Sequence, residues 1–251
     1  MNFSLSGKKV LVTGSSAGIG LGIALTLKEL GCQLVINGRN AQKLKVAADC
    51  LPDSLAIIAD VSSPTEAQAL ISQAVDNLGG LDAVVCNVGS GVSVPPGGES
   101  FDEWQRVFST NLWSTTNVVE ASKKALSESK GNIICISSIC GIETIPGAPV
   151  TYSVAKAALN AYISGISRPL GDQGIRINGI ALGNIMFPGS VWDKKTSEKP
   201  EAVKAMLRAE VPLGRLGTID DVTHFISFIM SNNASFITGA VFVVDGGQIR
   251  R

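Results

Sequence analysis

The sequence predicts an α/β fold, a doubly wound parallel sheet of about seven strands with helices on both faces. Short runs rich in Val and Ile alternate about seven times with longer segments of helical periodicity. The apolar runs contain few polar residues, as expected for strands that helices cover on both faces. No composition break divides the 251 residues, so a single domain over residues 1–251 is expected.

Each expected element follows from its local pattern. The strands are short runs in which β-branched residues predominate: KVLVTG, QLVING, LAIIAD, LDAVVCN, GNIICIS, IRINGIA and AVFVVDGG. Helical spacing of apolar residues marks IGLGIALTLKEL and PTEAQALISQAVDNL, and helices are also expected around 101–128 and 150–172. Residues 183–199 read as a long irregular stretch, which suggests a functional segment because such loops are uncommon in compact domains. A substrate loop is therefore predicted at about 183–210.

Composition excludes several classes of partner. The chain has 21 basic and 21 acidic residues, so no net charge favours nucleic acid or anionic lipid, and a small-molecule partner is expected. No apolar run is long enough to span a membrane and the start lacks a signal-peptide pattern, which predicts a soluble, cytoplasmic protein. A metal site is not expected, because the only close cysteine pair, CISSIC, lacks zinc-ligand spacing. The five cysteines are interpreted as reduced, mostly core residues: Cys32, Cys50, Cys86, Cys135 and Cys140.

A glycine-rich turn follows the first expected strand. TGSSAGIG places three glycines directly before an amphipathic helix. Glycines allow a tight turn in which backbone N–H groups approach a pyrophosphate, and the positive helix N-terminus stabilises it. In this context the motif predicts a Rossmann-like dinucleotide site. Its candidate residues are Gly14, Ser16, Gly18, Ile19 and Gly20.

Residues at the ends of later strands complete this site in the prediction. Gly38 stands where an NAD-specific fold usually carries a carboxylate, and Arg39 follows it. A guanidinium can bind a 2′-phosphate and the missing carboxylate removes a repulsion, so NADP is favoured over NAD. The carboxyl ends of the third and fourth strands should border the same crevice, with Asp60 suited to the adenine amine. The candidates there are Asp60, Val61, Asn87 and Gly89.

Tyr152 and Lys156 lie four residues apart in the expected helix TYSVAKAALNAY, so both side chains can face one space. A tyrosine normally ionises near pH 10, too high for proton exchange at neutral pH. A nearby ammonium favours the phenolate and would bring the phenol into the useful range. By itself the pair could also be a solvated surface pair.

Together, these motifs resemble the short-chain dehydrogenase/reductase family over nearly the whole chain. The resemblance rests on TGxxxGxG, CNVG, the Asn of STNLW, the Ser pair of CISSICG, YxxxK and the terminal ITGAVFVVDGG. It implies a catalytic tetrad of Asn111, Ser138, Tyr152 and Lys156. In that reading Tyr152 is the general acid/base, Lys156 also holds the nicotinamide ribose, Ser138 orients the substrate oxygen and Asn111 retains a water. The backbone of Ile185 would meet the carboxamide.

The resemblance implies an NADP(H)-dependent oxidoreductase acting on a ketone or secondary alcohol. Many relatives are 3-oxoacyl-carrier-protein reductases, but Gln173 stands where such enzymes tend to carry basic residues. A sugar or polar-alcohol dehydrogenase using NAD(H) is an alternative, and a non-catalytic NADP(H)-sensing protein is another. Apolar residues on more than one face of VVEASKKAL and ALNAYISGI predict a homotetramer, or a homodimer if only one interface forms.

Overall fold

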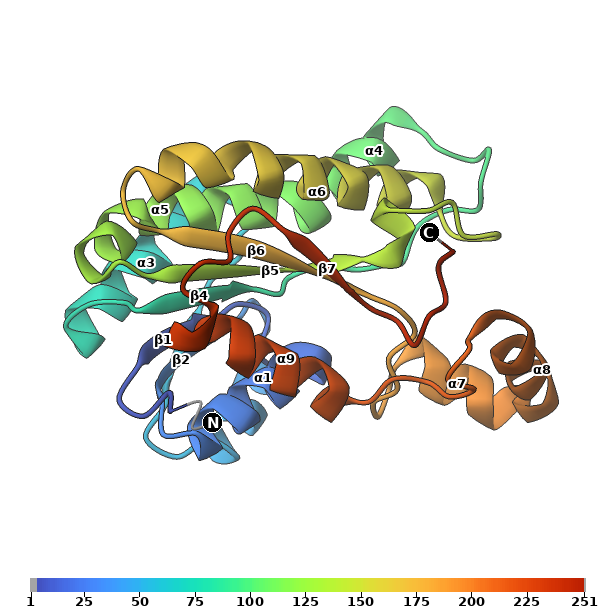
Figure 1. Ribbon diagram of the computed structural model, residues 1–251, viewed down its shortest axis with the longest axis horizontal. Helices are drawn as coiled ribbons and strands as arrows, with labels where there is room; N and C mark the ends of the chain where they lie inside the picture. Colours follow the sequence, from blue (N-terminus) through green and yellow to red (C-terminus); the bar gives the residue numbers. More distant parts are fainter. Residues whose placement is uncertain (1–3, 251) are drawn as a thin grey trace.

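Seven parallel strands form one sheet in the order β3-β2-β1-β4-β5-β6-β7 (Figure 1). The computed structural model describes residues 4–250; residues 1–3 and Arg251, the ends of the predicted domain, lie outside the described part. The strands are β1 (Lys9–Val12), β2 (Gln33–Gly38), β3 (Leu55–Ile58), β4 (Ala83–Cys86), β5 (Asn132–Ser138), β6 (Arg176–Leu182) and β7 (Val241–Val244). The predicted fold class is confirmed.

Helices cover both faces of the sheet, with α3, α5 and α6 on one and α1 and α9 on the other (Figure 1). The helices are α1 (Gly18–Glu29), α2 (Ala41–Asp49), α3 (Pro64–Leu78), α4 (Phe101–Phe108), α5 (Ser114–Ser129), α6 (Val150–Gly171), α7 (Val191–Glu198), α8 (Pro200–Glu210) and α9 (Ile219–Met230). Alternate strand residues enter the two cores, because side chains alternate across a sheet. Val10 and Val12 pack on the α1 side, whereas Leu11 packs on the α3 side.

The order of the strands determines where on the sheet a ligand-binding crevice forms. The chain winds outward from β1 to β3 in one direction and from β4 to β7 in the other. Where the direction reverses, between β1 and β4, the connections leave to opposite sides and a crevice opens at the carboxyl ends of the strands. Both the glycine turn after β1 and the segment after β4 lie at this crevice.

The predicted irregular stretch at 183–199 is wrong in its second half, and most of the predicted 183–210 loop is helical. Residues 191–198 form α7 and residues 200–210 form α8. Ser190 caps α7, since its hydroxyl accepts a hydrogen bond from the Asp193 N–H at 3.0 Å. Pro200 begins α8, where a missing N–H costs nothing. Figure 1 shows this helical pair beyond the end of the sheet, away from the two helical layers.

A π-helical turn interrupts the helical region predicted at 101–128. Residues Ser109–Trp113 separate α4 from α5, and Asn111 lies in the middle of this turn. Such turns are rare inside helices and often occur at functional sites. Across residues 4–250, the structure contains no helix with the length and apolar character needed to cross a bilayer.

Candidate active site

A cavity of about 840 Å³ lies at the carboxyl ends of β1, β2, β4 and β5. Its wall includes every residue that the sequence predicts for cofactor binding, from Gly14 in the glycine turn to Ile185 after β6. Ser138, Tyr152 and Lys156 line it as well. The structure thus brings residues that are distant in sequence to one space.

The glycine turn has the backbone geometry that its sequence predicts. Gly14 and Gly18 adopt φ angles of +63° and +59°, where a side chain would be strained. A Cβ on Gly20 would lie 2.4 Å from both the Gly14 carbonyl oxygen and Asn87 Nδ2. No side chain caps α1 at Ala17, so the first N–H groups of the helix remain available at the cavity. This turn can hold a pyrophosphate.

Two asparagines fix the turn to the neighbouring strand ends. Asn37, buried at the end of β2, donates to the carbonyls of Ile57 and Ala59 at 3.2 and 3.1 Å and accepts from the Gly14 N–H at 3.4 Å. Asn87 donates to the Gly14 carbonyl at 3.1 Å. Asn37 was missed by the sequence analysis, although an Asn within an otherwise apolar strand run was a signal that could have found it.

At the adenosine end of the cavity, Arg39 forms an ion pair with Asp60. Gly38 leaves the usual carboxylate position at the end of β2 empty, as predicted, but Arg39 lies 3.3 Å from the carboxylate of Asp60, which follows β3. Burial tends to raise the pKa of Asp60, yet hydrogen bonds from the Ser62 side chain and backbone, with Arg39, hold that pKa below its usual value. A bound phosphate must therefore compete with Asp60 for the guanidinium. Lys43, which the sequence analysis missed, lines the same end.

The predicted catalytic groups come together at the other end. Ser138 ends β5, its hydroxyl accepts from the Cys140 N–H at 3.2 Å, and the same hydroxyl is near enough to Tyr152 to oppose the rise in the pKa of its phenol. Tyr152 stands in the first turn of α6 and Lys156 one turn later, with the ammonium 5.9 Å from the centre of the phenol ring. Lys156 is buried and donates to the Ile136 carbonyl at 2.8 Å, which fixes its position over β5.

The electrostatics of the pair differ from the expectation. Burial raises the pKa of Tyr152 to about 12, although the Ser138 hydrogen bond opposes this and the Cys140 thiol adds to it. Burial lowers the pKa of Lys156 to about 8, with Cys135 opposing. The lowered phenol pKa expected from Lys156 is therefore not found in the chain alone. Desolvation of the phenol is the largest cause of its raised pKa.

Asn111 does not line the cavity. Its side chain is buried, accepts from the Ser90 N–H at 2.9 Å, and donates to the carbonyls of Ser90 and Val107 at 3.1 and 3.0 Å. A Cβ on Gly89 would lie 3.1 Å from both Asn111 Oδ1 and Lys156 Nζ, so the two side chains flank that glycine. Asn111 therefore supports the wall after β4 from behind.

Close contacts hold α6 against the end of β5. Ser137 donates to Asn160 Oδ1 at 2.6 Å, and Asn160 Nδ2 donates to the Gly141 carbonyl at 3.1 Å. A Cβ on Gly141 would lie 2.5 Å from the carbonyl carbon of Lys156. Asn160 and Gly141 thus set the distance between Ser138 and the helix that carries Tyr152. Neither was predicted, because both act through contacts distant in sequence.

Metal-ligating groups do not cluster in the structure. Within residues 4–250 no group of three or more His, Cys, Asp or Glu side chains could hold a metal ion. All five cysteines are free, and Cys50 is exposed rather than in the core. His224 is exposed on α9, outside the residues that line the cavity.

Comparison with known proteins decides the family. A family model described as Enoyl-(Acyl carrier protein) reductase matches residues 14–248. The chain is also 34% identical over 252 residues to 3-oxoacyl-(acyl-carrier-protein) reductase FabG of Rickettsia prowazekii (strain Madrid E), covering 98% of each protein. The chain belongs to the short-chain dehydrogenase/reductase family. The predicted resemblance is confirmed.

Solved structures of this family share the whole fold. L-sorbose reductase from Gluconobacter frateurii, complexed with NADPH and L-sorbose, is 25% identical with a TM-score of 0.93, and 100% of both chains is covered. A 7α-hydroxysteroid dehydrogenase complexed with NADH and 7-oxo glycochenodeoxycholic acid is 27% identical with a TM-score of 0.89, covering 100% of this chain and 97% of the other. The short-chain dehydrogenase/reductase fold therefore accommodates either nicotinamide cofactor and very different substrates.

Proposed function

We propose that the protein transfers hydride between NADP(H) and a ketone or secondary alcohol, with Tyr152 as general acid/base. The observation that best supports this proposal is the arrangement of the cavity. Tyr152, Ser138 and Lys156 line one end of it, and the glycine turn and the basic residue Arg39 after β2 line the other. A protein that only bound the nucleotide would have no need for a buried phenol and ammonium at this place. The competing sensor hypothesis predicts binding without turnover.

The chain supplies binding, orientation and a proton. Ser138 and the Tyr152 hydroxyl hold the substrate oxygen, and Tyr152 donates its proton to that oxygen in the reductive direction. Lys156 places positive charge beside the phenol and favours its ionised form after transfer. When bound, the nicotinamide supplies or accepts the hydride. The role of Asn111 as a water-retaining residue stays a proposal, which its place in a π turn behind the wall supports.

The residues present fit NADP(H). The glycine turn and the uncapped start of α1 would hold the pyrophosphate. Arg39 and Lys43 provide two cations for a 2′-phosphate, and Ile185 lines the nicotinamide end. Gly38 favours this assignment, because a Cβ there would already lie 3.0 Å from the Ser16 side chain, so a carboxylate at this position would be crowded.

We expect Arg39→Ala to weaken NADPH binding about tenfold or more and to leave NADH binding nearly unchanged. The guanidinium meets only the phosphate that NADH lacks, and a charge-assisted hydrogen bond contributes about 1.5–3 kcal/mol. Fluorescence titration with each cofactor measures the effect. Lys45→Ala is the matched control, since Lys45 is an exposed cation on α2, shortly after Arg39, but does not line the cavity. An equal loss of affinity for NADPH and NADH would show that Arg39 does not bind the 2′-phosphate.

A screen of carbonyl compounds and alcohols tests the reaction itself. Absorbance of the reduced nicotinamide would be followed with acyl thioesters, sugars and simple ketones. NADPH oxidation with a ketone, or NADP reduction with a secondary alcohol, supports the proposal. Tight NADPH binding without turnover of any compound would favour the sensor.

A polar, sugar-like substrate is the second candidate. The observation that favours it is the full-length similarity to a structure complexed with L-sorbose. The proposed substrate segment, residues 183–210, contributes both Phe187 and Trp192 to the cavity. Aromatic rings can cover either a sugar face or an acyl chain, so the screen must include both classes.

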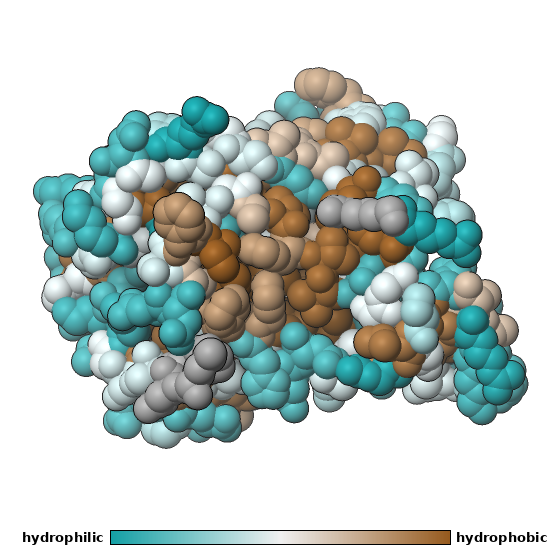
Figure 2. All heavy atoms as spheres, viewed as in Figure 1, coloured by the Kyte–Doolittle hydropathy of each residue, from teal (hydrophilic) through white to brown (hydrophobic). Residues whose placement is uncertain are grey.

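We also propose a homotetramer assembled through two faces of the chain. On α6, the exposed side carries Val150, Val154, Ala157, Ala161 and Gly165, a small apolar stripe suited to a close helix contact with a second copy. The second face lies around β7 and α9, where Figure 2 shows apolar side chains gathered at the centre of the view. Phe225, Phe242 and Val244 are only partly buried there.

Light scattering at micromolar concentration is expected to give a mass near four times 26.1 kDa. The sheet ends at β7, so this strand and the α6 stripe can each form a self-complementary contact. A Val154→Glu variant should reduce the mass to that of a dimer, because it buries an unpaired charge in one of the two interfaces. A monomeric wild-type protein would contradict the assembly, and a wild-type dimer would leave only one interface.

A further inference from the structure

The segment Ser90–Val94, which follows β4, forms the wall beside the proposed proton donor. Ser90 and Gly91 line the cavity. A Cβ on Gly91 would lie 3.9 Å from Cζ of Tyr152, so the backbone of this segment passes close to the hydroxyl end of the phenol. The position of Ser90–Val94 therefore determines how much room a substrate oxygen has at the Tyr152 hydroxyl.

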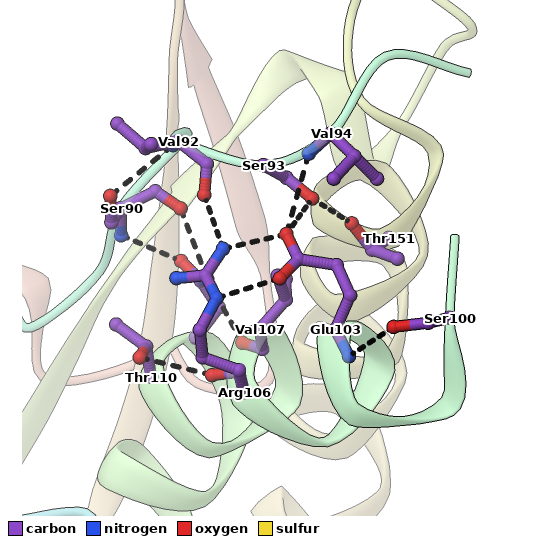
Figure 3. A network of polar contacts seen from close by, with 11 residues as sticks. Ser90, Val92, Ser93, Val94, Ser100, Glu103, Arg106, Val107, Thr110 and Thr151 are labelled. Carbon is purple, nitrogen blue, oxygen red and sulfur yellow. Dashed lines mark hydrogen bonds and ion pairs between the residues drawn. The ribbon is translucent and has the colours of Figure 1, made fainter. Parts of the chain in front are cut away.

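An ion pair on α4 holds this segment (Figure 3). The Arg106 guanidinium donates to both carboxylate oxygens of Glu103, at 2.8 and 2.7 Å, and to the Val92 carbonyl at 2.9 Å. Glu103 Oε1 also accepts from the Ser93 hydroxyl at 2.6 Å and from the Val94 N–H at 3.3 Å. The pair thus binds three consecutive residues of the segment.

Two further contacts connect the held segment to the predicted catalytic residues. The hydroxyls of Ser93 and Thr151 lie 2.6 Å apart, and Thr151 is fully buried and directly precedes Tyr152 on α6 (Figure 3). At the other end, the Asn111 side chain hydrogen-bonds to both backbone groups of Ser90. The segment consequently spans from the π turn to the start of the Tyr152 helix.

The pair differs from an ordinary surface salt bridge, which contributes little because both side chains stay mobile in water. The Glu103 side chain is only 14% exposed, and its carboxylate accepts four hydrogen bonds. Hydrogen bonds lower the pKa of the Glu103 carboxyl to about 2; the bond from Arg106 has the largest effect, and the bond from Ser93 adds to it. The lowered pKa favours the ionised carboxylate that these four hydrogen bonds require.

We propose that Glu103 and Arg106 are positioning residues, which hold Ser90–Val94 against the start of α6 so that a substrate oxygen meets the Tyr152 hydroxyl at reacting distance. Neither residue lines the cavity, so neither touches cofactor or substrate. The inference rests on the proposed function, because it concerns the same proton transfer. Since a misplacement of about 1 Å at a reacting centre can cost about a hundredfold in rate, the effect should appear in kcat.

The test compares Arg106→Ala, Glu103→Gln and the conservative Arg106→Lys with Asp53→Asn. The exposed Asp53 forms an ion pair with Lys28 just before the edge strand β3, and does not line the cavity, so its variant controls for loss of one surface pair. We expect kcat to fall about tenfold to a hundredfold in Arg106→Ala and Glu103→Gln and less in Arg106→Lys. The Kd for NADPH should stay within about twofold, and Asp53→Asn should match wild type. Hydrogen exchange should accelerate at the amides of residues 90–94.

A double variant separates this proposal from a general loss of stability. Combining Glu103→Gln with Arg106→Ala should lower kcat little beyond either single change, because both remove one contact. Wild-type kcat in both single variants would overturn the inference, as would equal losses in kcat and NADPH affinity. Absence of any turnover by wild type would overturn the proposed function and this inference together, whereas turnover by wild type with unchanged variants overturns this inference alone.

Discussion

Replacing Tyr152 with phenylalanine is expected to lower turnover by about 10²–10⁴-fold and to leave the Kd for NADPH nearly unchanged. The substitution removes only the hydroxyl that exchanges a proton with the substrate oxygen, and general acid/base catalysis contributes about this much. The ring, its packing against Gly91 and the glycine turn that holds the cofactor all remain. Steady-state kinetics and fluorescence titration with NADPH measure the two quantities.

Tyr162→Phe provides the matched control. The chain has only two tyrosines, and Tyr162 lies on the same helix, where burial raises the pKa of its phenol as well. It does not line the cavity, so its variant should turn over substrate like wild type. Comparable turnover of Tyr152→Phe and Tyr162→Phe at neutral pH would contradict the assigned role.

Replacing Gly141 with alanine is expected to reduce kcat about a hundredfold through geometry alone. The new Cβ would lie 2.5 Å from the carbonyl carbon of Lys156 and 2.8 Å from the N of Ala157, both backbone atoms of α6 that no side-chain rotation can move. The helix must shift away from β5, which separates Tyr152 from Ser138. Such overpacking also destabilises a protein by about 1–3 kcal/mol, so thermal unfolding should begin earlier.

Gly171→Ala separates this effect from glycine replacement in general. Gly171 ends α6, and nothing lies within 4 Å of a Cβ built there. Its variant should retain wild-type kcat, with equal or slightly higher stability because alanine has less conformational entropy to lose. If Gly141→Ala behaves like Gly171→Ala, the close contact between the β5 end and α6 does not set the catalytic geometry.

The fold and the nucleotide end of the site could be predicted because their signals are local. A buried strand needs an apolar run, and a dinucleotide turn needs glycines such as Gly14 and Gly20 where backbone atoms approach closely. The capping pair Ser190 and Asp193 was also a local signal for α7, and the length of the surrounding segment obscured it.

The remaining features depend on partners distant in sequence. The ion pair between Arg39 and Asp60 was not predicted, because Asp60 follows the next strand and only the fold brings the two charges to 3.3 Å. The contact between Ser137 and Asn160 likewise joins β5 to α6. The raised pKa of Tyr152 results from burial, which a motif of two residues on a helix cannot reveal.

Transfer of an isotope tests the central claim most directly. NADPH carrying deuterium at the transferable C4 position would be incubated with wild-type protein and the ketone that the screen identifies, and the product alcohol would be analysed by mass spectrometry. The account predicts one deuterium on the carbinol carbon, and formation of this product about 10²–10⁴-fold more slowly with Tyr152→Phe. An alcohol without deuterium, or an equally rapid transfer by the Tyr152→Phe variant, would contradict it.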